Sequence, residues 1–138
     1  MANLVFICAS EGNNALLARE VEAHAVAMGH SVEHVSLNEY DFPIYTVARE
    51  KATPVLEGID RLVEVLDRGE AWFVFAPEYN GTCPPVLNNT IAWLSREGDD
   101  FRRLFRDRVV ALGTHSGGGG NHVIMAMRQM FSYLGCVV

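Results

Sequence analysis

Lysine is almost missing from this chain of 138 residues: Lys51 is the only one, and the formal net charge at pH 7 is −6. A surface of this charge repels a phosphate backbone, so we expect no nucleic-acid partner. Long apolar runs are missing too, because the runs at residues 4–9 and 71–76 fall far short of the roughly 20 residues that cross a bilayer. No membrane partner is therefore expected.

The N-terminus carries no sign of a targeting segment. Residues 1–3 lead directly into an apolar run, without basic residues or a cleavage pattern, which predicts a cytoplasmic protein. Cysteine is scarce, and Cys8, Cys83 and Cys136 show no CxxC spacing and no companion histidine pair. We expect no metal site and three thiols kept reduced. With 49% hydrophobic and 20% charged residues, residues 1–138 are predicted to form one globular domain.

Strands and helices are predicted to alternate along the whole chain. Apolar runs predict strands at residues 3–9, 31–37, 71–76 and 109–113, with a fifth run beginning at 136–138. Helical spacing and end signals predict helices from Asn14 to Met28, Thr53 to Gly69, Pro84 to Leu94 and Asn121 to Leu134. This alternation favours right-handed crossovers and a doubly wound α/β domain with a parallel sheet. The charged stretch 96–108 is predicted to be a solvated surface loop rather than a binding site.

Ligands in such sheets bind beyond the carboxyl ends of the strands, where the strand order reverses. This rule selects three loops: SEGNN at residues 10–14, PEYNGT at 77–82 and THSGGGGN at 114–121. All three are rich in small or amide side chains. We therefore expect the functional site where these three loops meet.

The first loop joins a strand to a helix N-terminus, whose unpaired N–H groups favour an anion such as a phosphate. Ser10, Asn13 and Asn14 can add side-chain hydrogen bonds, and Gly12 permits a tight turn. No Lys or Arg occurs before Arg19, so dipoles and amides would have to hold the phosphate. Taken alone, the segment also fits an ordinary strand-to-helix turn with an asparagine cap.

The same segment excludes several enzyme classes. A P-loop nucleotide hydrolase is excluded because there is no GK[ST] motif. A cysteine phosphatase is excluded because the loop after its cysteine ends in an arginine. In this chain Asn14 occupies about that position after Cys8. A receiver domain is excluded because Cys8-Ala9-Ser10 offers no acidic residue at the end of the first strand.

The second loop and the helix after it carry a more specific pattern. PEYNGT followed by CPPVLNNTIAWLS at residues 83–95 resembles the PEYNGS-x-P-x-x-L-K-N-A-I-D-W-L-S signature of the NAD(P)H-dependent FMN reductase family, which includes flavodoxin-like quinone and azo-dye reductases. The glycine-rich segment at 116–120 also looks like a loop of that family. The first loop departs from the family's G-S-x-R-x-x-S-x-N pattern, because it is shorter and lacks the arginine.

The resemblance implies a flavodoxin-like sheet of five strands in the order 2-1-3-4-5, with the family's last helix absent from this chain. It implies FMN as cofactor, NADPH or NADH as hydride donor, and hydride passage through flavin N5 to a quinone, flavin, azo or similar small-molecule acceptor. The cofactor performs the chemistry, so no catalytic side chain is expected. The implied contacts to FMN, besides the four residues of the first loop, are Pro77, Glu78, Tyr79, Asn80, Gly81, His115, Ser116, Gly117, Gly118 and Gly119.

Several roles stay open at the level of sequence. Glu78 and Tyr79 are assigned to binding rather than proton transfer. His115 either assists the reduced flavin or is a plain loop histidine. Trp93 and Phe131 are expected to pack in the core or at an interface. The resemblance further implies a homodimer or homotetramer, and the alternative functions are a non-enzymatic FMN-binding module and a cofactor-free flavodoxin-like module.

Overall fold

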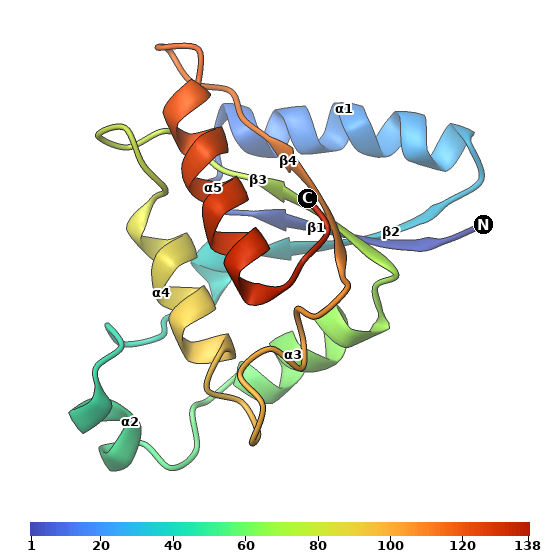
Figure 1. The fold of residues 1–138 in the computed structure, drawn as a ribbon. Helices are drawn as coiled ribbons and strands as arrows, with labels where there is room; N and C mark the ends of the chain where they lie inside the picture. Colours follow the sequence, from blue (N-terminus) through green and yellow to red (C-terminus); the bar gives the residue numbers. More distant parts are fainter.

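The computed structural model describes all residues from Met1 to Val138 and shows a single α/β unit (Figure 1). The chain alternates between strands and helices as predicted. Its elements are β1 (Asn3–Cys8), α1 (Asn13–Ala27), β2 (Ser31–Ser36), a 3₁₀ turn η1 (Leu37–Glu39), α2 (Val47–Ala52), α3 (Ile59–Arg68), β3 (Ala71–Phe75), α4 (Pro85–Leu94), β4 (Val109–Gly113) and α5 (Asn121–Leu134).

The sheet has four parallel strands in the order β2-β1-β3-β4. The predicted five-stranded order is not confirmed, because the expected fifth strand is present only as an isolated parallel bridge between Val109 and Val137. Gly135 ends α5 in the left-handed conformation, and Val137 after it exchanges backbone hydrogen bonds of 2.9 and 2.8 Å with Arg108 and Val110. The four strands place the loops after β1, β3 and β4 at the same edge.

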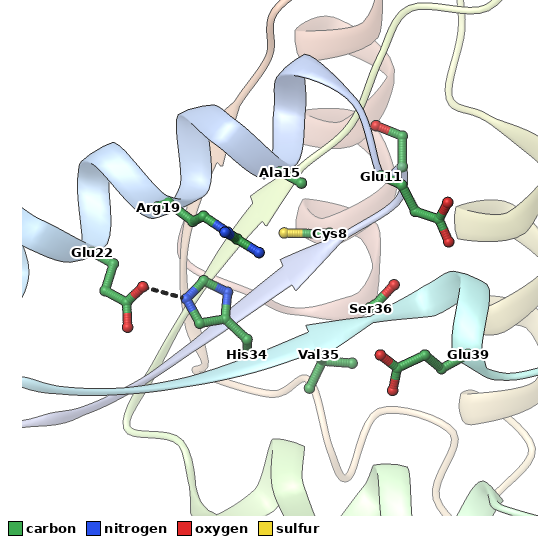
Figure 2. A pocket seen from close by; sticks show the side chains of 10 residues that line it. Cys8, Glu11, Ala15, Arg19, Glu22, His34, Val35, Ser36 and Glu39 are labelled. Atoms are coloured by element: carbon green, nitrogen blue, oxygen red, sulfur yellow. Dashed lines mark hydrogen bonds and ion pairs between the residues drawn. The ribbon is translucent and has the colours of Figure 1, made fainter.

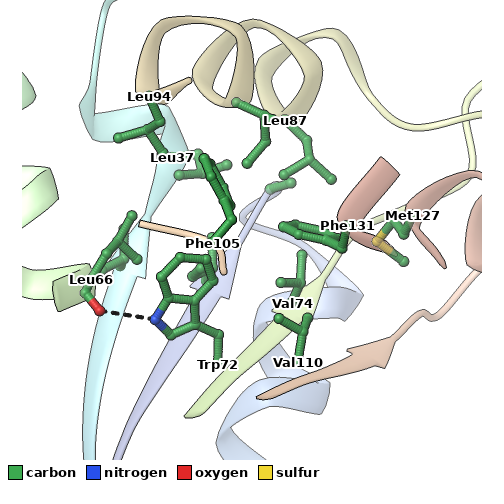
Figure 3. Close-up of a cluster of buried hydrophobic side chains, with 14 of the residues drawn as sticks. Leu37, Leu66, Trp72, Val74, Leu87, Leu94, Phe105, Val110, Met127 and Phe131 are labelled. Atoms are coloured by element: carbon green, nitrogen blue, oxygen red, sulfur yellow. Dashed lines mark hydrogen bonds between the residues drawn. The ribbon is translucent and has the colours of Figure 1, made fainter. Parts of the chain in front are cut away.

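Two apolar layers enclose the sheet, one on each face. Alternate residues of β1 point into the two layers. Leu4 and Phe6 face α1, whereas Val5 and Ile7 face the larger cluster under α3, α4 and α5. Figure 3 shows this larger cluster, in which the Trp72 indole donates to the Leu66 carbonyl oxygen at 3.0 Å. Helices therefore cover both faces, which is the arrangement expected of a doubly wound domain.

The region between β2 and β3 differs most from the prediction. The helix expected from Thr53 begins at Ile59, and Val55, which lies within the predicted range, is 77% exposed. A short helix, α2, was not predicted. Its first turn is capped by the Thr46 hydroxyl, which accepts a hydrogen bond from the Arg49 N–H at 3.1 Å. Because α2 buries none of its residues, it has no apolar periodicity for a sequence to reveal.

The charged stretch 96–108 is only in part a solvated loop. Arg103 pairs with Asp67 and Arg106 with Asp100 at the surface, whereas the Arg108 side chain is only 16% exposed and lies over the Trp72 ring. Leu104 and Phe105, in contrast, are buried in the larger cluster. The predicted surface loop therefore also seals one end of the core, because a bulky apolar side chain placed among charges still gains from burial.

All three cysteines are free and buried. Burial raises the pKa of the Cys136 thiol from 9.0 to about 11, although Arg108 acts in the opposite direction. A folded-state pKa above that of the unfolded chain contributes stability that is lost as the pH rises between these values. We expect the free energy of unfolding to fall between pH 9 and about 11 in urea titrations. The fall should be shallower in Cys136→Ala, and equal slopes in the two proteins would contradict this assignment.

Candidate FMN site

The loops after β1 and β3 border one cavity of about 540 Å³, and His115 from the loop after β4 also lines it. We call it the loop cavity. Its volume lies within the range of small-molecule sites. It is lined by Ala9, Ser10, Glu11, Gly12, Asn13, Asn14, Asn38, Pro77, Tyr79, Pro84, Pro85, Val86 and His115. The prediction that these three loops meet is confirmed by the fold.

The N-terminus of α1 opens into the loop cavity. Gly12 is the N-cap, and no side chain caps the helix. The Ala15 N–H donates to the Gly12 carbonyl oxygen at 3.0 Å, whereas the N–H groups of Asn13 and Asn14 have no carbonyl partner and are available to an anion. A Cβ on Gly12 would meet no atom within 4 Å, which shows that space is open beside this turn. The start of α1 thus offers free donors and open space where the sequence predicts a phosphate.

Asn14, by contrast, turns its amide toward the third loop. Its Oδ1 accepts a hydrogen bond from the His115 N–H at 2.7 Å, and its Nδ2 donates to the His115 carbonyl oxygen at 3.1 Å. The residue is 2% exposed although it borders the cavity. Its side chain therefore ties the first loop to the third.

The second loop is a tight hairpin. Tyr79 and Thr82 exchange two backbone hydrogen bonds of 3.0 Å, and the two residues between them, Asn80 and Gly81, have φ of 52° and 73°. Positive φ at both central positions is the geometry of a type I′ turn, for which Asn-Gly is the favoured pair. The hairpin holds Tyr79, which is half exposed, at the wall of the loop cavity.

Glu78 caps the last helix of the domain. Its Oε2 accepts hydrogen bonds from the N–H groups of His122 and Val123, each at 3.1 Å. A carboxylate at this place satisfies two unpaired donors and complements the helix dipole. The second loop is thus fastened to α5 within the same chain.

Two hydroxyl groups join the second and third loops. The Glu78 N–H donates to the Ser116 Oγ at 2.8 Å, and Ser116 lies 2.8 Å from the Thr114 Oγ1. Thr114 in turn donates to the Ala76 carbonyl oxygen at 2.7 Å. Because each hydroxyl donates one proton, the chain of bonds runs in a single direction from Glu78 to Ala76. Ser116 and the Glu78 amide are therefore engaged with each other.

The predicted residues divide into two groups. Ser10, Gly12, Asn13, Asn14, Pro77, Tyr79 and His115 line the loop cavity, whereas Glu78, Asn80, Gly81, Ser116, Gly117, Gly118 and Gly119 do not. Gly117 and Gly119 lie beyond it in open space. The sequence analysis missed Asn38, which follows β2. The rule that selected the other loops applies to the carboxyl end of β2 as well, and would have found it.

A second cavity of about 660 Å³ lies between α1 and β2, and Ser10 and Glu11 border both cavities (Figure 2). Arg19 lies in this second cavity and forms no ion pair, while Glu22 binds His34 at 2.8 Å. Burial raises the pKa of the Cys8 thiol, and nearby Arg19 lowers it in part. The first cation of the chain is therefore set apart from the loop cavity.

The groups that line the loop cavity are of the kinds that FMN requires. The unpaired amides suit a phosphate, and Tyr79, Pro85 and Val86 give the wall apolar and aromatic surface for a ring system. The charge is less favourable, because Glu11 is the one acidic side chain on this wall and no Lys or Arg lines it. The phosphate would be held by backbone dipoles alone.

Solved structures of flavoproteins share this fold. FerB, a flavoenzyme NAD(P)H:(acceptor) oxidoreductase from Paracoccus denitrificans, superposes with a TM-score of 0.82 at 20% identity, covering 99% of this chain and 74% of FerB. An azoreductase from Bacillus anthracis gives 0.73 at 16% identity, covering 99% and 83%. RosB with bound 8-demethyl-8-formylriboflavin-5′-phosphate gives 0.82 at 13% identity, covering 100% of this chain and 62% of RosB.

No curated protein matches the sequence. No helix has the length and apolarity to span a membrane. The sequence model of the NADPH-dependent FMN reductases, in contrast, matches residues 2–138, which is nearly the whole chain. FMN and NAD(P)H, the predicted cofactors, are those of this group of flavin oxidoreductases. The chain belongs to the NADPH-dependent FMN reductase family.

Proposed function

We propose that this protein binds FMN in the loop cavity and uses NAD(P)H to reduce a small planar acceptor such as a quinone, a flavin or an azo compound. The observation that carries the proposal is the meeting of an uncapped helix N-terminus with the Tyr79 hairpin around one cavity. Hydride transfer from NAD(P)H and electron delivery to the acceptor are the chemistry that bound FMN supplies. We also propose a cytoplasmic homodimer or homotetramer.

The chain's own residues hold and orient the cofactor in this proposal. Ser10 and the N–H groups of Gly12 and Asn13 face the phosphate at the start of α1. Tyr79 and Pro77 border the ring, and Glu78 keeps their hairpin in place through α5. No side chain in the cavity is arranged as a nucleophile with a base, so the protein binds and positions.

The proposal is tested by adding FMN to the purified protein and following the quenching of flavin fluorescence. We expect saturable binding, followed by anaerobic bleaching of the flavin absorption when NADPH or NADH is added. Binding without bleaching would favour the non-enzymatic FMN module, and no binding would favour the cofactor-free module. Either outcome overturns the proposed oxidoreductase.

A charge variant locates the phosphate within the cavity. Glu11→Gln removes the acidic group from the wall. The affinity for FMN should therefore rise by a factor of roughly three or more at low salt, and by less at high salt. Glu20→Gln is the matched control, because Glu20 is an exposed residue of α1 that lines neither cavity. Equal gains from both variants would place the phosphate elsewhere.

A further inference from the structure

The Asn14 side chain is an unusual feature of the site. Both polar atoms of its buried amide bind the backbone of a single residue, His115, which lies far away in sequence. The two bonds to His115 join residues 101 positions apart. They connect the start of α1 to the loop after β4, two segments that no strand pairing joins directly, since β3 lies between β1 and β4.

We infer that Asn14 is a positioning residue for the FMN site: its amide holds the segment 114–120 against the start of α1. The inference rests on the proposed function. His115 is the one residue of the third loop that lines the loop cavity, so the position of its backbone decides how far the third loop reaches into the site. Asn14 grips that backbone directly.

The third loop needs such a grip. Residues 117–119 are exposed glycines, and glycine has more backbone freedom to lose than any other residue. The Ser116 hydroxyl fixes one side of the segment to Glu78, and Gly120 begins α5 on the other. Without Asn14 the face of the loop that meets α1 would have no hydrogen bond to it, and FMN would have to order the segment on binding.

Hydrogen–deuterium exchange of the FMN-free protein tests the grip. We expect faster exchange in the segment 114–120 in Asn14→Ala, and unchanged exchange there in Asn13→Ala, its exposed neighbour on the same cavity wall. FMN affinity should fall roughly tenfold or more in Asn14→Ala relative to the unaltered protein, since an ordering cost is added to binding. Unchanged exchange, or equal affinities, would overturn the inference.

The variants Asn14→Asp and Asn13→Asp carry the same added carboxyl group. Comparing them gives a pH-dependent effect that loss of packing would not produce. Asn14→Asp retains the acceptor for the His115 N–H, but its carboxyl can donate to the His115 carbonyl oxygen only when protonated. Burial favours that proton, whereas the exposed carboxyl of Asn13→Asp, with a pKa of about 3.9, stays ionised above pH 5.

The exchange rate of the segment 114–120 without FMN, taken as a ratio to that of the unaltered protein, should therefore fall from pH 8 to pH 5 for Asn14→Asp and stay constant for Asn13→Asp. Glu11, Tyr79 and His115, the titratable side chains of the same wall, are common to all these proteins and cancel in the ratio. Equal ratios for the two variants would overturn the inference.

If the unaltered protein binds no FMN, the proposed function fails, and the inference fails with it. If the unaltered protein and Asn14→Ala bind FMN equally well, the inference fails and the proposed function stands.

Discussion

Replacing Phe105 with alanine should lower the free energy of unfolding by about 3–5 kcal/mol, as expected for a large aromatic side chain removed from a core. Phe105 is fully buried, and its ring meets that of Trp72 edge to face, with centroids 5.9 Å apart and planes at 85°. A loss of this size is a large part of the roughly 5–15 kcal/mol that holds a domain folded. Urea denaturation followed by circular dichroism measures it.

Phe101 provides the control in the same charged stretch. It is 42% exposed and carries Arg102 over its ring at 4.9 Å, so Phe101→Ala should cost about 1 kcal/mol or less. A solvated loop would make the two substitutions equally mild. Equal and small effects would therefore show that residues 101–107 do not seal the core as described.

The second large effect is expected from Gly120→Ala. Gly120 has a φ of 71°, and a Cβ added there would overlap the methyl group of Thr114. Left-handed strain of about 1–2 kcal/mol and overpacking of about 1–3 kcal/mol should together destabilise the protein by roughly 2–5 kcal/mol. Thermal or urea unfolding measures the sum.

Two companion variants separate the strain from the clash. Gly119→Ala shares the strain, with a φ of 86°, but its Cβ would meet no atom within 4 Å, so it should cost only about 1–2 kcal/mol. Thr114→Ser removes the methyl group and keeps the hydroxyl, so Gly120→Ala should cost less in that background. If the cost is the same with and without the Thr114 methyl, the overlap is not its cause.

The parts of the fold predictable from sequence were those with strong periodicity or a local end signal. The predicted bounds of α4 and α5 agree with the structure to within one residue, and Gly135 ends α5 with a positive φ. Helix α2 lacks a buried face, and the start of α3 depends on a turn that no apolar repeat marks. The sequence therefore missed the first and misplaced the second.

The candidate site divides along a similar line. Strand-end geometry is enough to select the three loops that meet. The hairpin turn was not predicted, although Asn-Gly is its favoured pair. Which polar groups stay free was not predictable, because the partners lie far apart in sequence. The Glu78 carboxylate caps α5, and the Asn14 amide binds His115, each a contact formed only by the folded sheet.

The central position of β1 in the sheet affects how the newly made chain folds. Leu4 pairs with Val32 on one side and with Ala71 on the other, so the first strand to leave the ribosome completes its pairing only after β3 has emerged. Until then its apolar residues lack their final neighbours, which makes folding slower and exposes a nascent-chain segment suited to chaperone capture.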